Sequence, residues 1–383
     1  FRCSRQIDAD RRRFEPPSGP QARQTRQMAQ RVDVVVIGAG AMGSATAWWL
    51  ARRGRSVAVV EQFEQGHARG SSHGATRIFR YAYEDRRYAR MAQQALPLWR
   101  ELEDDAGRRL LEITGGLDHG DPALVDPIAR SLDACAVDYE RLAPDAAAER
   151  WPGMRFDGTV LHCPGAGRCL ADATVLALQG RAVALGADVR FGTGPASLTW
   201  TDGTATVRAG NVEWRAPVAV VTAGAWLPSV VGERVPLPPL SLTREHIQHF
   251  VPRSPDVAWP SFIHHEPEGW RFGLMSPGEG VKVAEHMTGP PTDPDDPPPP
   301  EPDVPGTGDP ADRVRRYVEE WLPGLDPAPV HPATCLYTTT PTHDFVLERH
   351  GPIVVGSPCS GHGFKFTPLI GRMLADLATA PSG

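Results

Sequence analysis

The chain has 383 residues, of which 41% are hydrophobic and 22% are charged, and its formal net charge at pH 7 is −6. This composition supports a sizeable core and excludes a disordered or fibrous protein. The acidic balance disfavours nucleic acid as a partner. No stretch approaches 18 consecutive apolar residues, so we expect no membrane-spanning helix and no membrane partner.

The cysteines show no metal-binding or disulfide spacing. None of the six forms a CxxC pair, which argues against a zinc ribbon and against a disulfide-dense secreted fold. We therefore expect a reducing, cytoplasmic location. The cysteines are Cys3, Cys135, Cys163, Cys169, Cys335 and Cys359.

Residues 1–30 are rich in arginine and lack apolar periodicity. They contain no apolar segment of the kind found in secretory signals. We expect a disordered tail here, outside the folded domain.

A strand–helix–strand unit follows. The run VDVVVIG (32–38) predicts a buried parallel strand, and SATAWWLARRG (44–54) predicts a helix. SVAVVE (56–61) predicts the second strand. Such βαβ units of about thirty residues build parallel sheets.

A glycine motif lies at the turn of this unit. Gly38, Gly40 and Gly43 form GxGxxG between the first strand and the helix. The three glycines allow, in turn, a tight turn, close approach of a pyrophosphate and close helix–strand packing. Glu61 ends the second strand, where a carboxylate binds ribose hydroxyls and repels a 2′-phosphate. The unit predicts a dinucleotide site, and the motif alone leaves NAD and FAD open.

Later segments alternate less regularly. Helices are predicted at 86–106, 172–185 and 313–324, and strands at 187–192 and 216–226. Residues 287–310 contain ten prolines and predict an extended loop.

Lysine is almost absent. Of 40 basic residues only Lys282 and Lys365 are lysines, which leaves 38 arginines. Arginine replaces lysine readily on a surface but not where a compact ammonium, or one whose pKa can fall, is needed. Both lysines are therefore candidates for a role in the chemistry of a functional site.

Four segments resemble one family. They are SSHGATRIFRYAY (71–83), VKVAEH (281–286), CLYTTTPTHDF (335–345) and SGHGFKF (360–366). Together with the GxGxxG unit they resemble the monomeric sarcosine oxidase and N-methyltryptophan oxidase family of FAD-dependent amine oxidases. The resemblance runs in the same order from about residue 31 to 378.

The resemblance implies roles for residues that bind the flavin and act at it. Cys335 matches the cysteine that bonds covalently to the flavin, and His73 and Arg77 match residues packed against the flavin ring. Gly363 falls in the loop that closes over the flavin. Lys282 matches the lysine beside the flavin where oxygen is reduced.

The resemblance also implies a substrate pocket. Arg80 and Lys365 match the pair that grips the substrate carboxylate, and His286 matches a histidine of the pocket. The family places a tyrosine just before the lysine segment, where this chain has Phe272 or Arg271, depending on one gap. Phenylalanine would make the pocket more apolar, whereas arginine would suggest a second acidic group on the substrate.

The implied fold is α/β, a two-domain flavoprotein like glutathione reductase and p-hydroxybenzoate hydroxylase. A Rossmann-type FAD-binding domain from 31–112, 166–227 and 333–379 interleaves with an antiparallel-sheet substrate domain. The substrate domain takes 113–165 and 228–332.

The implied function is oxidation of a secondary or cyclic amino acid to an imine, with oxygen as acceptor and hydrogen peroxide as product. Three alternatives remain: a same-fold dehydrogenase with another acceptor, an NAD-dependent dehydrogenase and a non-catalytic flavin-binding protein. We expect a monomer. We expect no metal site, because His264 and His265, adjacent on a strand, point to opposite sides.

Overall fold

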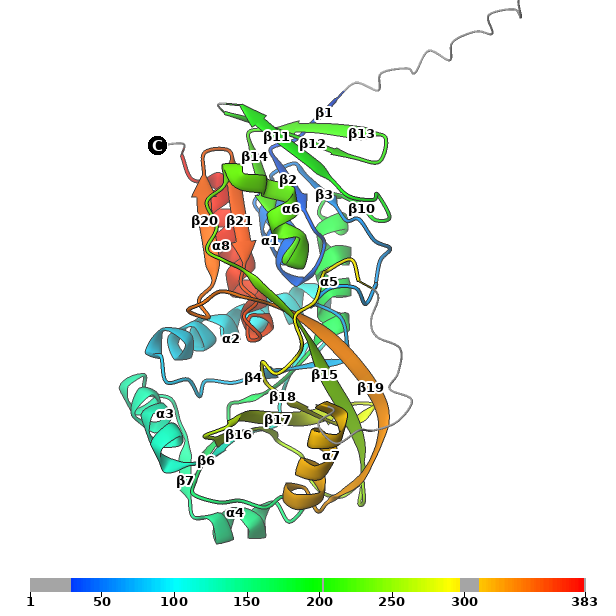
Figure 1. The fold of residues 1–383 in the computed structure, drawn as a ribbon. Coiled ribbons are helices and arrows are strands. Elements are labelled where there is room, and N and C mark those ends of the chain that lie inside the picture. The colour runs from blue at the N-terminus through cyan, green and yellow to red at the C-terminus, as the bar shows by residue number, and fades with distance from the viewer. Residues whose placement is uncertain (1–28, 202, 297–309, 382–383) are drawn as a thin grey trace, which may run out of the picture.

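The structure is a computed structural model that describes residues 29–201, 203–296 and 310–381. Within these ranges the strands form four sheets, arranged in two halves (Figure 1). The upper half in Figure 1 contains a six-stranded sheet, and the lower half contains an eight-stranded sheet.

The six-stranded sheet is built from short β-branched runs. Its order is β10 (Asp188–Arg190), β3 (Val57–Val60), β2 (Val34–Ile37), β14 (Val218–Val221), β21 (Ile353–Ser357) and β20 (Val346–His350). All neighbours pair in parallel except β20, which is antiparallel to β21. Every residue of the central strands is buried, as expected for a parallel sheet covered on both faces.

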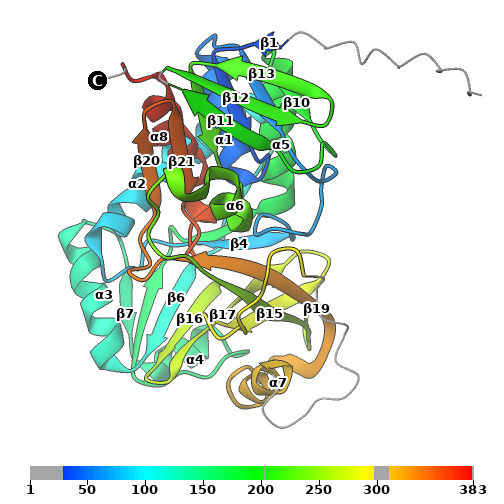
Figure 2. The same ribbon diagram turned by 45° about the horizontal axis from the view of Figure 1, so that its top comes forward.

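Helices cover one face of this sheet and a second sheet covers the other (Figure 2). On the helical side lie α1 (Ala41–Arg52), α5 (Ala171–Ala184) and α8 (Thr367–Thr379), with α2 (Arg86–Ala106) packed against α8. On the other side lies a sheet in the order β1 (Gln30–Arg31), β13 (Val212–Ala216), β12 (Thr204–Ala209) and β11 (Ser197–Thr201). The parallel sheet and its βαβ unit are those of a Rossmann-type domain, but a small sheet here replaces the helices on one face.

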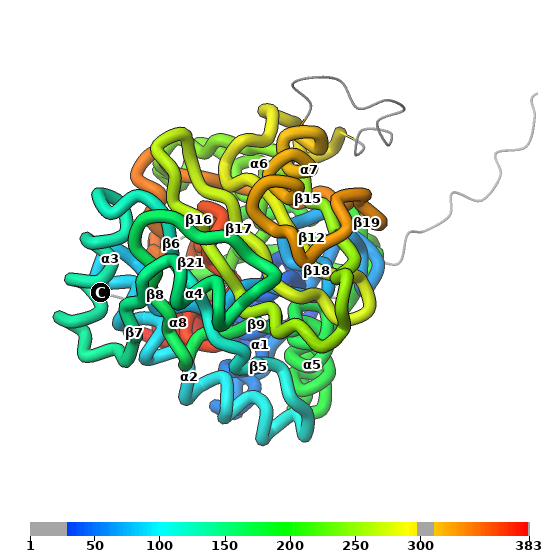
Figure 3. The backbone as a smooth tube through the Cα atoms, turned by 90° about the horizontal axis from the view of Figure 1, so that it is seen from below, coloured from blue at the N-terminus to red at the C-terminus, as the bar shows by residue number. Residues whose placement is uncertain are grey.

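The eight-stranded sheet is antiparallel apart from one pair. Its order is β19 (Leu325–Thr339), β15 (Ser241–Pro252), β18 (Gly280–Glu285), β17 (Gly269–Ser276), β16 (Ser261–Glu266), β6 (Gly116–Gly120), β8 (Thr159–Cys163) and β7 (Glu140–Leu142). Only β16 and β6 run parallel. Viewed from below, these strands lie in front of α1 and α8 (Figure 3).

The two faces of the eight-stranded sheet differ. The far face packs its apolar side chains against α7 (Pro310–Trp321), whose Val314 and Val318 are buried there. The near face, toward the six-stranded sheet, carries a small cluster around Ile247 and Cys335. Beside the sheet lie α3 (Pro122–Ala134) and α4 (Pro144–Arg150).

Short elements complete the fold. A three-stranded sheet of β4 (Thr76–Phe79), β9 (Gly167–Leu170) and β5 (Leu111–Ile113) lies between the halves. The turns η1 (Gly224–Trp226) and η2 (Gly232–Arg234) flank α6 (Leu227–Val231), and η3 (Phe364–Phe366) precedes α8.

Most predicted elements are confirmed. The helix predicted at 86–106 is α2, and the helix predicted at 172–185 begins one residue earlier. The helix predicted at 313–324 begins at Pro310, so the last residue of the predicted proline loop is helical. The rest of that loop is described only to residue 296.

The predicted tail and the predicted domain ranges compare with the structure as follows. Of the expected tail, residues 1–28 lie outside the described residues, whereas Gln30 pairs with Trp214 in β1. The domain ranges remain a prediction, and β19 crosses the predicted boundary at residue 333. In the described part of the chain, every helix is too short or too polar to cross a membrane.

Candidate functional site

A cavity of about 1090 Å³ lies between the two large sheets. It begins at the carboxyl ends of β2, β3 and β14 and extends to the near face of the eight-stranded sheet. Ligands of open α/β sheets bind at this edge. The predicted site residues that line it are Gly38, Gly40, Glu61, His73, Arg77, Arg80, Phe272, Lys282, His286, Cys335, Gly363 and Lys365.

The glycine turn is sterically restricted. Gly38 has φ +97°, and a Cβ there would lie 2.6 Å from the carbonyl oxygen of Thr222. A Cβ on Gly43, which lies in α1 outside the cavity lining, would come within 1.8 Å of the Gly38 oxygen. Gly40 caps α1, and a Cβ there would lie 3.0 Å from the Ser72 hydroxyl. The turn therefore brings bare backbone and a helix N-terminus to the cavity wall, which suits a phosphate.

Glu61 is buried beside this turn. Its carboxylate accepts hydrogen bonds from the backbone N–H of Ala39 (2.8 Å) and of Phe63 (3.1 Å). His67 Nε2 lies 3.5 Å from the same carboxylate. The negative group thus fastens the glycine turn while it lines the cavity, where it would disfavour a 2′-phosphate.

Arg77 links the loop that contains Ser71 and His73 to Cys335 of β19. Its Nη2 donates to the carbonyl oxygens of Ser71 (3.0 Å) and His73 (2.6 Å) and lies 3.7 Å from Cys335 Sγ. Cys335 is 6% exposed. Burial, followed by the charges of Arg77 and Lys282, lowers the pKa of His73 to about 4, so His73 is neutral at pH 7.

Lys282 faces the cavity because of strand alternation. Val281 and Val283, its neighbours in β18, pack into the far core, which turns Lys282 to the near face. Its Nζ donates to the Thr76 carbonyl oxygen at 3.3 Å. Burial, and next the charge of Arg77, lowers the pKa of Lys282 to about 7. The lysine is therefore poised between its charged and neutral forms near neutral pH.

Arg80 and Lys365 both lie near the ring of Tyr83. The Arg80 guanidinium lies 4.2 Å from the ring centroid of Tyr83, and Lys365 Nζ lies 5.5 Å from it. Lys365 donates to the His362 carbonyl oxygen at 2.7 Å. Burial, with the charge of Arg80, holds the pKa of Lys365 well below its usual value. An anion between the two side chains would relieve this penalty.

Arg80 also has a partner that the sequence did not indicate. Its Nη1 donates to Asp118 at 3.2 Å and to the Ala82 carbonyl oxygen. Asp118 lies on β6 and contacts His265 Nε2 at 2.8 Å. No motif marks Asp118, because only the pairing of β6 with β16 brings it here.

Aromatic rings form the wall beside these cations. Trp270 and His286 stack with centroids 5.3 Å apart at 5°, and Tyr337 lies edge-on to His286. Burial, then the charges of Arg80 and Lys365, lowers the pKa of His286 to about 3, which leaves a neutral imidazole. Tyr83 and Tyr337 both line the cavity.

The structure also shows which of Phe272 and Arg271 lines the cavity. Phe272 lines the cavity with Trp270 and Leu274, its alternate neighbours on β17. Arg271 points away and pairs with Glu266 and Glu285. The pocket is therefore apolar at this position and gains no charge.

Comparison with known proteins gives one consistent result. The sequence profile of the family described as FAD dependent oxidoreductase matches residues 33–377. Peroxisomal sarcosine oxidase of Homo sapiens is 33% identical, over 90% of this chain and 92% of that protein. Monomeric sarcosine oxidase of Bacillus sp. (strain NS-129) is 30% identical, over 92% and 94%. The solved structure of NikD, described as an unusual amino acid oxidase essential for nikkomycin biosynthesis, superposes with a TM-score of 0.80 at 28% identity, over 93% and 95%.

Proposed function

Because this chain belongs to the family of FAD-dependent oxidoreductases, we propose that it oxidises a secondary or cyclic amino acid to the imine and reduces oxygen to hydrogen peroxide. One observation carries the proposal. Two buried cations, Arg80 and Lys365, and a third, Lys282, line one cavity that continues to the glycine turn.

The described residues fit FAD. Gly38, Gly40 and the N-terminus of α1 would hold the pyrophosphate, and Glu61 would accept from the ribose hydroxyls. His73, Arg77 and Gly363 line the same cavity farther along. When bound, FAD supplies a two-electron acceptor whose electrons pass on to oxygen.

The proposed substrate enters with its carboxylate toward Arg80 and Lys365. A guanidinium offers two parallel donors and an ammonium offers a point charge, so the pair would fix both the position and the orientation of the carboxylate. The anion would also stabilise the charged form of Lys365, which burial otherwise disfavours.

The side chain or ring of the substrate would lie against the aromatic wall. Phe272 and Trp270 offer apolar surface there, and the neutral imidazole of His286 offers a hydrogen-bond acceptor to an amine. This combination favours an amino acid whose nitrogen lies in a ring or bears an alkyl group.

Lys282 is the proposed catalytic cation. A buried ammonium has little solvent screening, so it stabilises negative charge that develops beside it during oxygen reduction. Arg77, 3.7 Å from Cys335, is proposed to act with it from the neighbouring loop.

Cys335 is the proposed point of covalent flavin attachment. Its sulfur is buried on the wall of the cavity. We further propose that the domain ranges follow the predicted division and that the enzyme is cytoplasmic. The name of the monomeric bacterial relative supports the proposal that it is a monomer.

Anaerobic mixing of the purified flavoprotein with sarcosine, N-methyl aromatic amino acids, proline and pipecolate tests the proposal. We expect at least one of them to bleach the flavin absorption, and admission of air to restore it with one hydrogen peroxide per turnover. Bleaching without peroxide would indicate a dehydrogenase that uses another acceptor. Bound flavin that no amine reduces would indicate a non-catalytic flavin-binding protein.

A further inference from the structure

Two histidines face each other on the far side of the eight-stranded sheet. His119 of β6 and His264 of β16 are register partners, and their rings stack with centroids 4.2 Å apart at 22°. Side chains alternate along a strand, so the neighbouring residues Asp118 and His265 point to the opposite face, where they contact each other and Asp118 accepts from Arg80. The stacked pair therefore belongs to a different site from the one described above.

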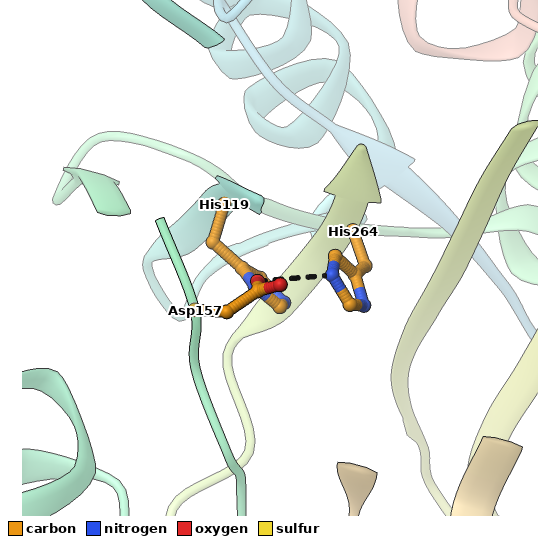
Figure 4. A group of neighbouring side chains, drawn as sticks. All are labelled: His119, Asp157 and His264. Carbon is orange, nitrogen blue, oxygen red and sulfur yellow. Dashed lines mark ion pairs between the residues drawn. The ribbon is translucent and has the colours of Figure 1, made fainter. Parts of the chain in front are cut away.

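A carboxylate completes the group. Asp157, from the segment between α4 and β8, lies 3.2 Å from His264 Nε2 and 3.9 Å from His119 Nδ1 through its Oδ1 (Figure 4). One donor atom from each of the three side chains lies within 4.8 Å of the others. Figure 4 shows the carboxylate turned toward the two rings.

Three of the four histidine ring nitrogens lack an aligned hydrogen-bond partner among the described residues. His119 is 1% exposed, and neither of its ring nitrogens has a hydrogen-bond partner among the described residues. His264 Nε2 also lacks an aligned partner there, although the Asp157 oxygen is close. A buried imidazole left without partners costs free energy, so such groups call for an explanation.

The surroundings hold the three side chains in place. The Tyr317 hydroxyl lies 3.2 Å from His264 Nδ1, and the tautomer in which Nδ1 donates to this hydroxyl has its lone pair on Nε2. Phe156 packs edge-on against His119, and Trp321 against His264. Gly158, at φ +56°, brings the Asp157 segment against β6, because any Cβ would lie 1.9 Å from the Gly120 oxygen.

We infer that His119, His264 and Asp157 bind a divalent transition metal ion of the zinc class. Two neutral imidazoles and one carboxylate are a ligand set that Zn²⁺ and its late first-row neighbours accept. Ideal tetrahedral bonds need donor atoms closer together than the 4.8 Å within which these lie, so the side chains would have to turn toward a bound ion. The 52% exposed side chain of Asp157 leaves a path for the ion and for a water ligand.

This inference departs from the expectation of no metal site. That expectation considered His264 with its sequence neighbours, and their opposite orientation is confirmed by the contact of His265 with Asp118. His119 is 145 residues from His264, and only the parallel pairing of β6 with β16 brings the two together.

The expected role is to anchor the loop and the two strands. The ion would tie the Asp157 segment to β6 and β16, which carry Asp118 and His265 on their opposite face. Metal binding would therefore restrain the strand that carries Asp118, the buried partner of Arg80.

Titration of chelator-treated, flavin-loaded protein with Zn²⁺ in a calorimeter tests the inference, with Co²⁺ absorption as a second readout. We expect one equivalent of Zn²⁺ to bind and to raise the midpoint of thermal unfolding. Asp157→Asn and His264→Gln should each weaken binding at least about tenfold. Asp157→Asn is the main variant. Because the side chain of Asp157 is exposed, this substitution should disturb the fold least.

Glu348→Gln is the matched control. Glu348 pairs with His350 at 3.1 Å on β20. The substitution therefore removes a histidine–carboxylate contact that has no third metal-binding side chain in the described part of the chain. Zn²⁺ affinity should not change in this variant. Absence of stoichiometric binding, or binding unaltered by both Asp157→Asn and His264→Gln, would overturn the inference.

Discussion

The guanidinium of Arg80 lies 3.2 Å from the carboxylate of Asp118, and both side chains are almost completely buried. Arg80 is thus held by a protein carboxylate before any substrate arrives. Because Asp118 also contacts His265 at 2.8 Å, the charge of Arg80 is only partly neutralised. Arg80, one of the two side chains proposed to bind the substrate carboxylate, is therefore already positioned. Its remaining N–H donors are available to a second anion.

This pairing predicts that Arg80→Ala weakens both substrate binding and stability. Loss of hydrogen bonds to a charged group should raise KM for carboxylate substrates about 10- to 100-fold. The uncompensated Asp118 should lower the free energy of unfolding by about 3 kcal/mol, the lower end for a broken buried pair, because His265 still contacts it.

The double variant Arg80→Ala/Asp118→Asn separates the two effects. It removes the stranded charge, so we expect most of the lost stability to return in urea unfolding while KM stays high. Recovery of KM in the double variant would show that Arg80 does not bind the substrate.

Lys282 predicts a pH dependence of the oxygen reaction. With a pKa of about 7, Lys282 carries its charge below pH 7 and loses it above. Stopped-flow reoxidation of the reduced enzyme by oxygen should therefore slow as the pH rises from 6 to 9. A bound anion would move this midpoint upward but would not change its direction.

Lys282→Met should remove both the charge and its pH dependence. We expect reoxidation about 100-fold slower than in the unaltered enzyme below pH 7, and flat with pH, because one stabilising group for a developing anion is lost. Anaerobic reduction by substrate should change far less. An equal loss in both half-reactions would contradict the assignment.

The glycine turn predicts two unequal alanine variants. A Cβ on Gly43 would lie 1.8 Å from a backbone oxygen, which cannot move aside, whereas a Cβ on Gly40 would meet the rotatable Ser72 hydroxyl at 3.0 Å. Gly43→Ala should destabilise the protein by about 3 kcal/mol, as overpacking does, and abolish FAD retention. Gly40→Ala should keep the fold and weaken the binding of FAD. Thermal unfolding of the apoproteins, followed by FAD titration, compares them, and equal destabilisation by the two would contradict the steric argument.

Some of the residues that line the cavity could be singled out from the sequence. The glycine turn and Glu61 stand at recognisable positions because strand, turn and helix follow one another along the chain, and the two lysines were singled out by their rarity. Asp118 and the His119–His264 pair could not be predicted, since they depend on the pairing of β6 with β16, which lie over 140 residues apart. The choice between Phe272 and Arg271 required the register of β17, where a shift of one residue reverses the face.

Cys335 predicts the fate of the flavin on denaturation. Its sulfur is buried against the Arg77 guanidinium in the cavity, so acid precipitation should leave the flavin absorption in the protein pellet. Cys335→Ala should release the flavin to the supernatant. Cys359→Ala is the matched control, because Cys359 lines the same cavity and its sulfur instead accepts the backbone N–H of Thr338 at 3.4 Å. Flavin that stays in the pellet with Cys335→Ala but not with Cys359→Ala would move the attachment to Cys359, and release from the unaltered protein would show that the flavin is held without a covalent bond.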